Sequence, residues 1–165
     1  MTTEWFRAYL DAFNMSDFER LRDFFAQDVV FEHLPPLPRL EGRDALFAFY
    51  RDFKRRVSET IEPLDMILSE TGIAAEVRGT FTALQDMPDF PATPLRRGET
   101  FTLRGVVFYR LRAGRFVHIR NVARIAAVHR ALSGETRDLV ASGQGPGGIS
   151  RRMGPSADSE ITENQ

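Results

Sequence analysis

Apolar residues recur at helical spacing in the first third of the chain. Between residues 3 and 14 they form one stripe, which predicts a helix. Ser16 is followed by Glu19 three residues later, a pattern typical of a capping box, so a second helix is expected to start there and to end at Asp28. A third helix is predicted over residues 43–57.

The second half of the chain alternates between apolar and polar residues, as strands with one buried face do. The alternation is clearest over residues 73–84. Two more strands are predicted at 101–112 and 115–128, joined by a hairpin turn at Ala113-Gly114. Shorter strands are expected at 29–34 and 66–70.

Proline and glycine divide the chain further. Residues 35–41 contain three prolines and predict a rigid loop, and residues 85–99 predict a long connection. The sequence from residue 133 onward is rich in Gly, Ser and Pro, so we expect a domain at 1–132 and a flexible tail at 133–165. Gly143, Gly145 and Gly148 match a G-x-G-x-x-G motif there, but no predicted strand precedes them and no helix follows, so a nucleotide site is not expected.

Composition narrows the function classes. The chain has 165 residues, 42% of them hydrophobic, with 14 Phe, and this predicts one domain with a bulky aromatic core. The net charge of −1 does not indicate a nucleic-acid partner. The sequence has no cysteine, no membrane-spanning apolar run and no signal-peptide pattern, so we expect a cytoplasmic protein. Its three histidines lack metal-ligand spacing, so neither a metal nor a cofactor is expected.

The stretch from Tyr9 to His33 carries the candidate chemistry. If the helices pack back on the strand that follows them, the Tyr9 phenol and the His33 imidazole reach one apolar pocket. A phenol donor opposite an imidazole base is a plausible proton-transfer pair. Two plainer interpretations stay open: Tyr9 as an ordinary core tyrosine, and His33 as a residue that caps its strand or bonds the proline-rich loop.

The segments AYLDAFNMSDFERL, FFAQDVVFEH, LEGRDALFAFY and GETFTLRGVVFYRLRAGRFVHIRNV resemble the NTF2-like superfamily, in its ketosteroid-isomerase and SnoaL-like polyketide cyclase branch. The resemblance covers about residues 3–128. It implies an α+β cone in which three N-terminal helices pack on a curved antiparallel (mixed) β-sheet and enclose a hydrophobic cavity. The superfamily includes isomerases, dehydratases, cyclases, epoxide hydrolases and non-enzymatic binders, so fold alone does not decide function.

Residue-by-residue, the resemblance places the oxyanion-binding tyrosine of the isomerases on Tyr9 and their general-base aspartate on His33. The second oxyanion donor falls on Val107, which cannot donate. The histidine and aspartate of the cyclases fall on Ile119 and Asn121, whereas His118 has the opposite strand parity and is expected to face away. Residues expected to contact a substrate are Asn121, Phe31, Tyr50, Val107, Tyr109 and Ile119.

Two functional hypotheses follow. The first is a cofactor-independent isomerase, dehydratase or cyclase acting on a small, largely apolar carbonyl or polycyclic compound, with His33 as base and Tyr9 as donor. The alternative is a non-catalytic module that binds a small hydrophobic molecule or only dimerises. In either case we expect a homodimer formed through the β-sheet, and no nucleic-acid or membrane partner.

Overall fold

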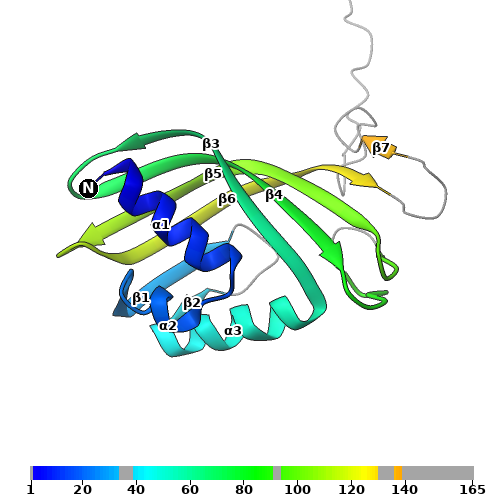
Figure 1. The fold of residues 1–165 in the computed structure, drawn as a ribbon, viewed down its shortest axis with the longest axis horizontal. Coiled ribbons are helices and arrows are strands. Elements are labelled where there is room, and N and C mark those ends of the chain that lie inside the picture. The colour runs from blue at the N-terminus through cyan, green and yellow to red at the C-terminus, as the bar shows by residue number, and fades with distance from the viewer. Residues whose placement is uncertain (1, 34–38, 91–93, 130–135, 139–165) are drawn as a thin grey trace, which may run out of the picture.

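The computed structural model describes residues 2–33, 39–90, 94–129 and 136–138. Three helices gather on one face of a curved sheet, and the long strands arch over them (Figure 1). This confirms the predicted α+β arrangement of helices on a curved mixed sheet. None of the described helices is both long and apolar enough to cross a membrane.

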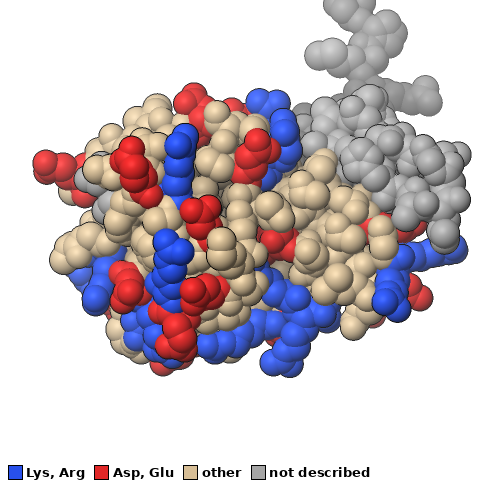
Figure 2. Space-filling view, viewed as in Figure 1, with Lys and Arg blue, Asp and Glu red and all other residues tan. Residues whose placement is uncertain are grey.

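The first and third helices agree with the sequence prediction. Helix α1 spans Thr3–Asn14, and the Thr2 side chain caps it by accepting the N–H of Trp5. Helix α3 spans Arg43–Arg56, with Asp44 in its first turn and three basic residues in its last turn, as the helix dipole favours. Over α2 and α3, basic and acidic side chains are interspersed on the surface (Figure 2).

The predicted second helix is wrong in its cap and its length. Ser16 has a φ of 57°, in the left-handed region, and Asp17 caps the helix instead by accepting a backbone N–H at 3.0 Å. Helix α2 covers only Phe18–Leu21. The next phenylalanines continue a helical spacing in sequence, but the chain is already extended at Phe25, where it pairs with Phe116 of the sheet. Sheet pairing overrides the local helical pattern here.

In the part of the chain that the structure describes, seven strands form one mixed sheet in the order β2-β1-β6-β5-β4-β3, with β7 paired to β6. β1 and β6 are parallel, and the other neighbouring strands are antiparallel. At the β5–β6 turn, Ala113 and Gly114 have φ of 51° and 72°, as a type I′ hairpin requires. The strands span Phe25–His33 (β1), Leu40–Glu41 (β2), Val57–Leu68 (β3), Gly72–Ala83 (β4), Thr100–Arg112 (β5), Arg115–His129 (β6) and Thr136–Asp138 (β7).

The largest departure from the predicted sheet is β3. It begins directly after α3 and runs for 12 residues, whereas the sequence predicted a strand only at 66–70. Pro63 and the charged residues near it interrupt the alternation of apolar and polar residues from which a strand is predicted. The proline is tolerated because β3 is an edge strand and its register shifts between Pro63 and Asp65. Residues 57–61 therefore join the sheet and help to enclose the interior.

The predicted connections and tail are described in part. Within 35–41, Leu40–Glu41 pairs with β1 as β2, and residues 34–38 lie outside the described chain. Within 85–99, Met87 and Leu95 form an isolated bridge. Three residues of the predicted tail, Thr136–Asp138, pair with β6, while the Gly143–Gly148 motif and most of the tail lie outside the described residues.

Aromatic rings make up much of the core. Phe116 is fully buried, and its ring lies 4.8–5.5 Å, between centroids, from those of Trp5, Tyr9, Phe25 and Tyr109. A second, smaller cluster contains Phe81 and Phe101, whose rings stack at 4.6 Å. Such pairs add to the stability gained by burying apolar area. Members of both clusters line a common cavity.

Candidate functional site

A cavity of about 720 Å³ lies inside the curve of the sheet. Its walls come from α1, α3, strands β1 and β3–β6, and the connection that follows β4. The fold brings all eight residues that the sequence assigned to a site onto these walls. They are Tyr9, Phe31, His33, Tyr50, Val107, Tyr109, Ile119 and Asn121.

Tyr9 is held by the aromatic core. Its ring lies 4.8–6.2 Å from six others, those of Phe6, Phe13, Phe24, Phe25, Tyr109 and Phe116. Burial raises the pKa of its phenol well above the ordinary value, and the neighbouring phenols, including a hydrogen bond with Tyr109, raise the pKa further. The Tyr9 hydroxyl therefore keeps its proton and acts as a donor.

The three tyrosines of the chain all line this cavity. Burial raises the pKa of Tyr109 strongly, while its hydrogen bond with Tyr9 lowers that pKa. Because either hydroxyl can donate in this bond, one of the two phenol protons is left for another acceptor. Tyr50 lines the cavity from α3, and burial likewise raises the pKa of its phenol.

His33, Asn121 and Val107 form one strip of the cavity wall. His33 ends β1 and pairs with Asn121 of β6, and Asn121 pairs in turn with Val107 of β5. Paired residues on adjacent strands share a face of the sheet. The Oδ1 atom of Asn121 is buried and has no hydrogen-bond partner within the described residues. Leaving a buried amide oxygen unpaired is costly, so a hydroxyl or N–H of a ligand fits there.

His118 faces the other side of the sheet, as its strand parity predicts. Its Nε2 lies 3.0 Å from Oε2 of Glu32, and Nε of Arg120 donates to the same oxygen at 3.0 Å. Arg120 and then His118 hold the pKa of Glu32 below its ordinary value. Strict alternation would place Phe116 on the same outer face as His118, but Phe116 is fully buried because the β5–β6 register shifts between Arg110 and Leu111.

Glu59 also lines the cavity, although no pattern in the sequence marks it as a site residue. It lies on β3, opposite the buried Phe81 of β4. Burial raises the pKa of its carboxyl from the ordinary 4.5 to about 7, and the charge of Lys54 opposes that shift. Period-two alternation from Val57 through Glu59 to Ile61 was the available signal. A charged residue at an inward position broke the apolar pattern by which strands are recognised.

Polar contacts tie α1 to the elements beside Glu59. The Asn14 side chain donates to the carbonyl of Ile61 at 3.0 Å and accepts the N–H of Ile61 at 2.8 Å. Nζ of Lys54 donates to the carbonyl of Phe13 and lies 3.9 Å from the centre of the Phe13 ring. These contacts fix β3 and α3 against the helix that carries Tyr9.

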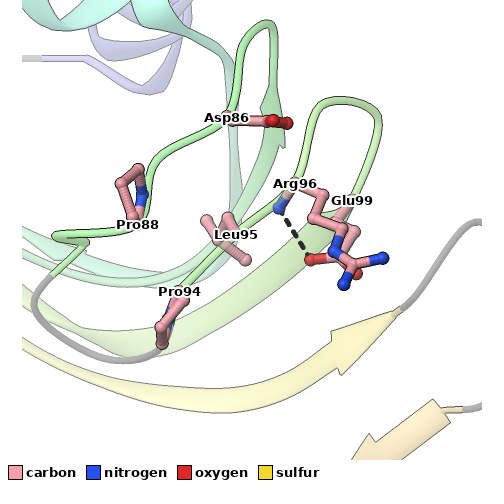
Figure 3. Close-up of a pocket in the computed structure, with 6 residues that line it drawn as sticks. All are labelled: Asp86, Pro88, Pro94, Leu95, Arg96 and Glu99. Carbon is pink, nitrogen blue, oxygen red and sulfur yellow. Dashed lines mark hydrogen bonds between the residues drawn. The ribbon is translucent and has the colours of Figure 1, made fainter.

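The connection after β4 supplies the remaining wall, from Gln85 to Phe90. A second hollow of about 390 Å³ lies against this connection, and Figure 3 shows its lining. Its carboxylates already have partners: Glu99 accepts the N–H of Arg96 at 2.9 Å, and Asp86 accepts that of Arg97 at 2.9 Å. These bonds shape the loop, so the larger cavity is the candidate site.

Among the described residues, no three His, Cys, Asp or Glu side chains come together as a metal site requires. The cavity instead offers phenol and amide donors, an imidazole and a half-buried carboxyl within aromatic walls. Such a set can bind a carbonyl oxygen and exchange a proton with a nearby carbon.

Comparison with known proteins agrees with this fold. A sequence model of the SnoaL-like domain family matches residues 6–119. No curated protein matches significantly. A candidate polyketide cyclase from Xanthomonas campestris pv. campestris is 26% identical, with a TM-score of 0.62 over 72% of this chain and 87% of that chain.

Two more distant structures share the fold. An LEH-like epoxide hydrolase from M. tuberculosis is 14% identical, with a TM-score of 0.59 over 73% of this chain and 80% of that chain. Wild-type IdmH from Streptomyces antibioticus, a candidate polyketide cyclase, is 19% identical, with a TM-score of 0.60 over 73% of this chain and 90% of that chain.

Proposed function

The chain belongs to the SnoaL-like domain family, and we propose that it is a cofactor-independent acid–base enzyme acting on a small, largely apolar carbonyl compound. The reaction would be an isomerisation, a dehydration or an aldol-type cyclisation. One observation carries the proposal: a single apolar cavity collects His33, Asn121 and all three phenols of the chain. The similarity to a candidate polyketide cyclase points in the same direction.

The size and lining of the cavity support this substrate class. A volume of about 720 Å³ falls within the range typical of small-molecule sites. Aromatic walls exclude water and strengthen hydrogen bonds to a developing charge. One proton of the hydrogen-bonded Tyr9–Tyr109 pair stays available, and we assign it to Tyr109, where it would point to a substrate oxygen while Tyr9 supports it. Asn121 would orient a substrate hydroxyl or N–H with its unpartnered oxygen.

The proton step needs no cofactor. A base such as His33 removes a proton from the carbon beside the carbonyl, and the electron pair of that C–H bond moves to form the enolate. The negative charge settles on the oxygen that Tyr109 contacts. Where the enolate is conjugated with a C=C bond, the protonated base can return the proton to the far carbon and complete an isomerisation. Where a hydroxyl stands on the β carbon, the protonated base can give it the proton, so that it leaves as water and completes a dehydration.

Deuterium exchange tests this step without knowledge of the natural substrate. In D2O, the protein should accelerate deuterium incorporation beside the carbonyl of 2-tetralone, an apolar bicyclic ketone, as followed by NMR. Tyr109→Phe removes a donor to the enolate and should lower the enzymatic rate roughly 10²- to 10³-fold. His118→Gln, on the outer face, is the control that should keep the wild-type rate. Exchange no faster than in buffer would overturn the proposal.

A non-catalytic binding module is the second candidate. The packing of Tyr9 among six rings favours it, because that phenol is used inside the core rather than presented alone to a ligand. Saturable binding of 2-tetralone without accelerated exchange, and equal affinity in a Tyr9→Phe/His33→Ala double variant, would select this candidate over the enzyme.

A further inference from the structure

We propose that Glu59 is the group that takes the proton from the substrate and returns it, an inference that rests on the proposed acid–base function. No sequence motif marks this residue, and the base expected from the sequence was His33. The assignment comes from the place of Glu59 in the fold, from its lack of a partner and from the groups that face it.

Strand parity directs Glu59 inward. Val57 and Ile61, two residues before and after it, share its face of β3, and Val57 is fully buried. Glu59 and Ile61 both line the cavity, as does Phe81 across the strand pair. Because Asn14 bonds both backbone groups of Ile61, this part of the edge strand is fixed in register and cannot turn its carboxyl outward without losing those bonds.

Glu59 has no ion pair or hydrogen bond within the described residues, unlike the outward-facing acids nearby. On the same strand, Glu62 pairs with Arg78 at 3.3 Å, and on β4 Glu76 pairs with Arg104 at 2.7 Å. Glu59 is half-buried on the cavity wall, and partly withdrawing a carboxyl from water without a partner has a cost. A group kept at such a cost inside a cavity is a candidate for chemistry rather than for stability.

The groups that face Glu59 suit a proton acceptor. The charge of Glu59 raises the pKa of Tyr9, Tyr50 and Tyr109, so all three phenols lie within its electrostatic range. Phenols that stay protonated can hold the substrate oxygen while the carboxylate takes the carbon-bound proton. The other titratable groups on the cavity wall are His33, Arg56, Asp86 and Asp89.

The positive charge of Lys54 favours the ionised form of Glu59. Lys54 lies on α3 and is fixed by its bond to the Phe13 carbonyl, and its charge lowers the pKa of Glu59 against the effect of burial. The result, a carboxyl pKa of about 7, allows Glu59 to accept a proton and release it again near neutral pH. Lys54 is a positioning residue here, since it acts on the substrate through Glu59.

The step is balanced without a co-reactant. The Glu59 carboxylate forms an O–H bond with the proton beside the carbonyl, the C–H pair becomes the C=C bond of the enolate, and the carbonyl oxygen takes the charge. The protonated carboxyl then gives the same proton to another carbon, or to a leaving hydroxyl that departs as water.

Exchange of 2-tetralone in D2O tests the inference through matched variants. Glu59→Gln keeps the size of the side chain and removes the base, so exchange should fall roughly 10²- to 10⁴-fold. Glu62→Gln, three residues along the same strand and facing outward, should keep the wild-type rate. The wild-type rate should rise with pH through about 7, and Lys54→Met should move that midpoint upward.

A second readout does not depend on turnover. In protein labelled with ¹³C at the Glu carboxyls, the signal missing from Glu59→Gln should titrate near 7 in the wild type and higher in Lys54→Met. The assignment of Glu59 would be wrong, with the proposed function still standing, if Glu59→Gln kept the wild-type exchange rate or if only His33→Gln abolished exchange. Titration of the Glu59 signal near 4.5 would have the same meaning. Absence of exchange in the wild type would instead overturn the proposed function.

Discussion

On the outer face of the sheet charged side chains pair with one another, whereas on the inner face two polar groups have no hydrogen bond or ion pair within the described residues. Outside, Glu32 contacts Arg120 and His118, and Glu76 contacts Arg104. Inside, Glu59 and Oδ1 of Asn121 have no partner within the described residues. The two faces belong to the same strands, so the difference does not come from composition or from distance along the chain.

This difference separates two uses of polar residues. Paired charges on the surface stay in contact with solvent and contribute little free energy each. Unpaired polar groups inside an aromatic cavity destabilise the folded chain, and a bound ligand can remove that cost by supplying the missing donor or proton. Substitutions on the inner and outer faces should therefore differ in their effects on stability, and four experiments test this expectation.

The largest expected effect concerns packing. Phe116→Ala empties a fully buried site and should lower the free energy of unfolding by about 3–5 kcal/mol. Phe108→Ala, on the outer face of β5 where the ring is 49% exposed, should cost less than about 1 kcal/mol. Urea unfolding of both variants measures the contrast, and equal losses would contradict the two-face account.

The second effect is the pH dependence of stability. Between pH 4.5 and about 7 the folded protein keeps a proton on Glu59 that the unfolded chain releases. Wild-type stability should therefore fall as pH rises through this window, relative to Glu59→Gln, by at most about 3 kcal/mol. Urea unfolding of both proteins at pH 5 and pH 8 checks this. If the difference in unfolding free energy between the wild type and Glu59→Gln did not change with pH, the Glu59 carboxyl would be solvated as in the unfolded chain.

Two asparagines give a matched pair. Asn14→Leu removes two bonds to the backbone of Ile61 and should cost about 1–3 kcal/mol. Asn121→Leu replaces an amide whose oxygen has no partner within the described residues, and should stabilise the fold by up to about 1 kcal/mol. Thermal unfolding of the two variants should thus shift in opposite directions, and a strong loss in Asn121→Leu would show that its amide is already satisfied.

The smallest effect lies on the outer face. Arg104→Ala breaks a 2.7 Å pair with Glu76 in which both side chains are at least one-third exposed. The loss should be about 0.2–1 kcal/mol and should shrink as salt is added, because solvent screens such pairs. A larger loss of unfolding free energy, or one that does not depend on salt, would mean that the outer ion pairs contribute substantially to stability.

Much of the fold could be predicted from the sequence. The stripe on α1, the alternation of β4 and the Ala113-Gly114 turn are local patterns that the structure repeats. The second helix was wrong because pairing at Phe25 is a long-range contact that no local spacing contains.

The site was predictable in part. The resemblance placed Ile119 and Asn121 inward, and strand parity then placed His118 outward. The Tyr9–His33 pair was proposed from the residues themselves and supported by the resemblance. Glu59 was missed because its strand carries a proline and because an inward charge resembles an exposed position in sequence. What marks Glu59 is the absence of a partner, which only the assembled fold reveals.

The most direct test of this account asks whether a carboxylate faces a ligand hydroxyl inside the cavity. Excited 2-naphthol is a strong acid that transfers its proton to a nearby base, and its emission then moves to the naphtholate band. Bound to the wild type, it should show naphtholate emission that grows as pH rises through about 7, is lost in Glu59→Gln and persists in Glu62→Gln. Identical emission in both variants, or no binding of 2-naphthol at all, would contradict the account.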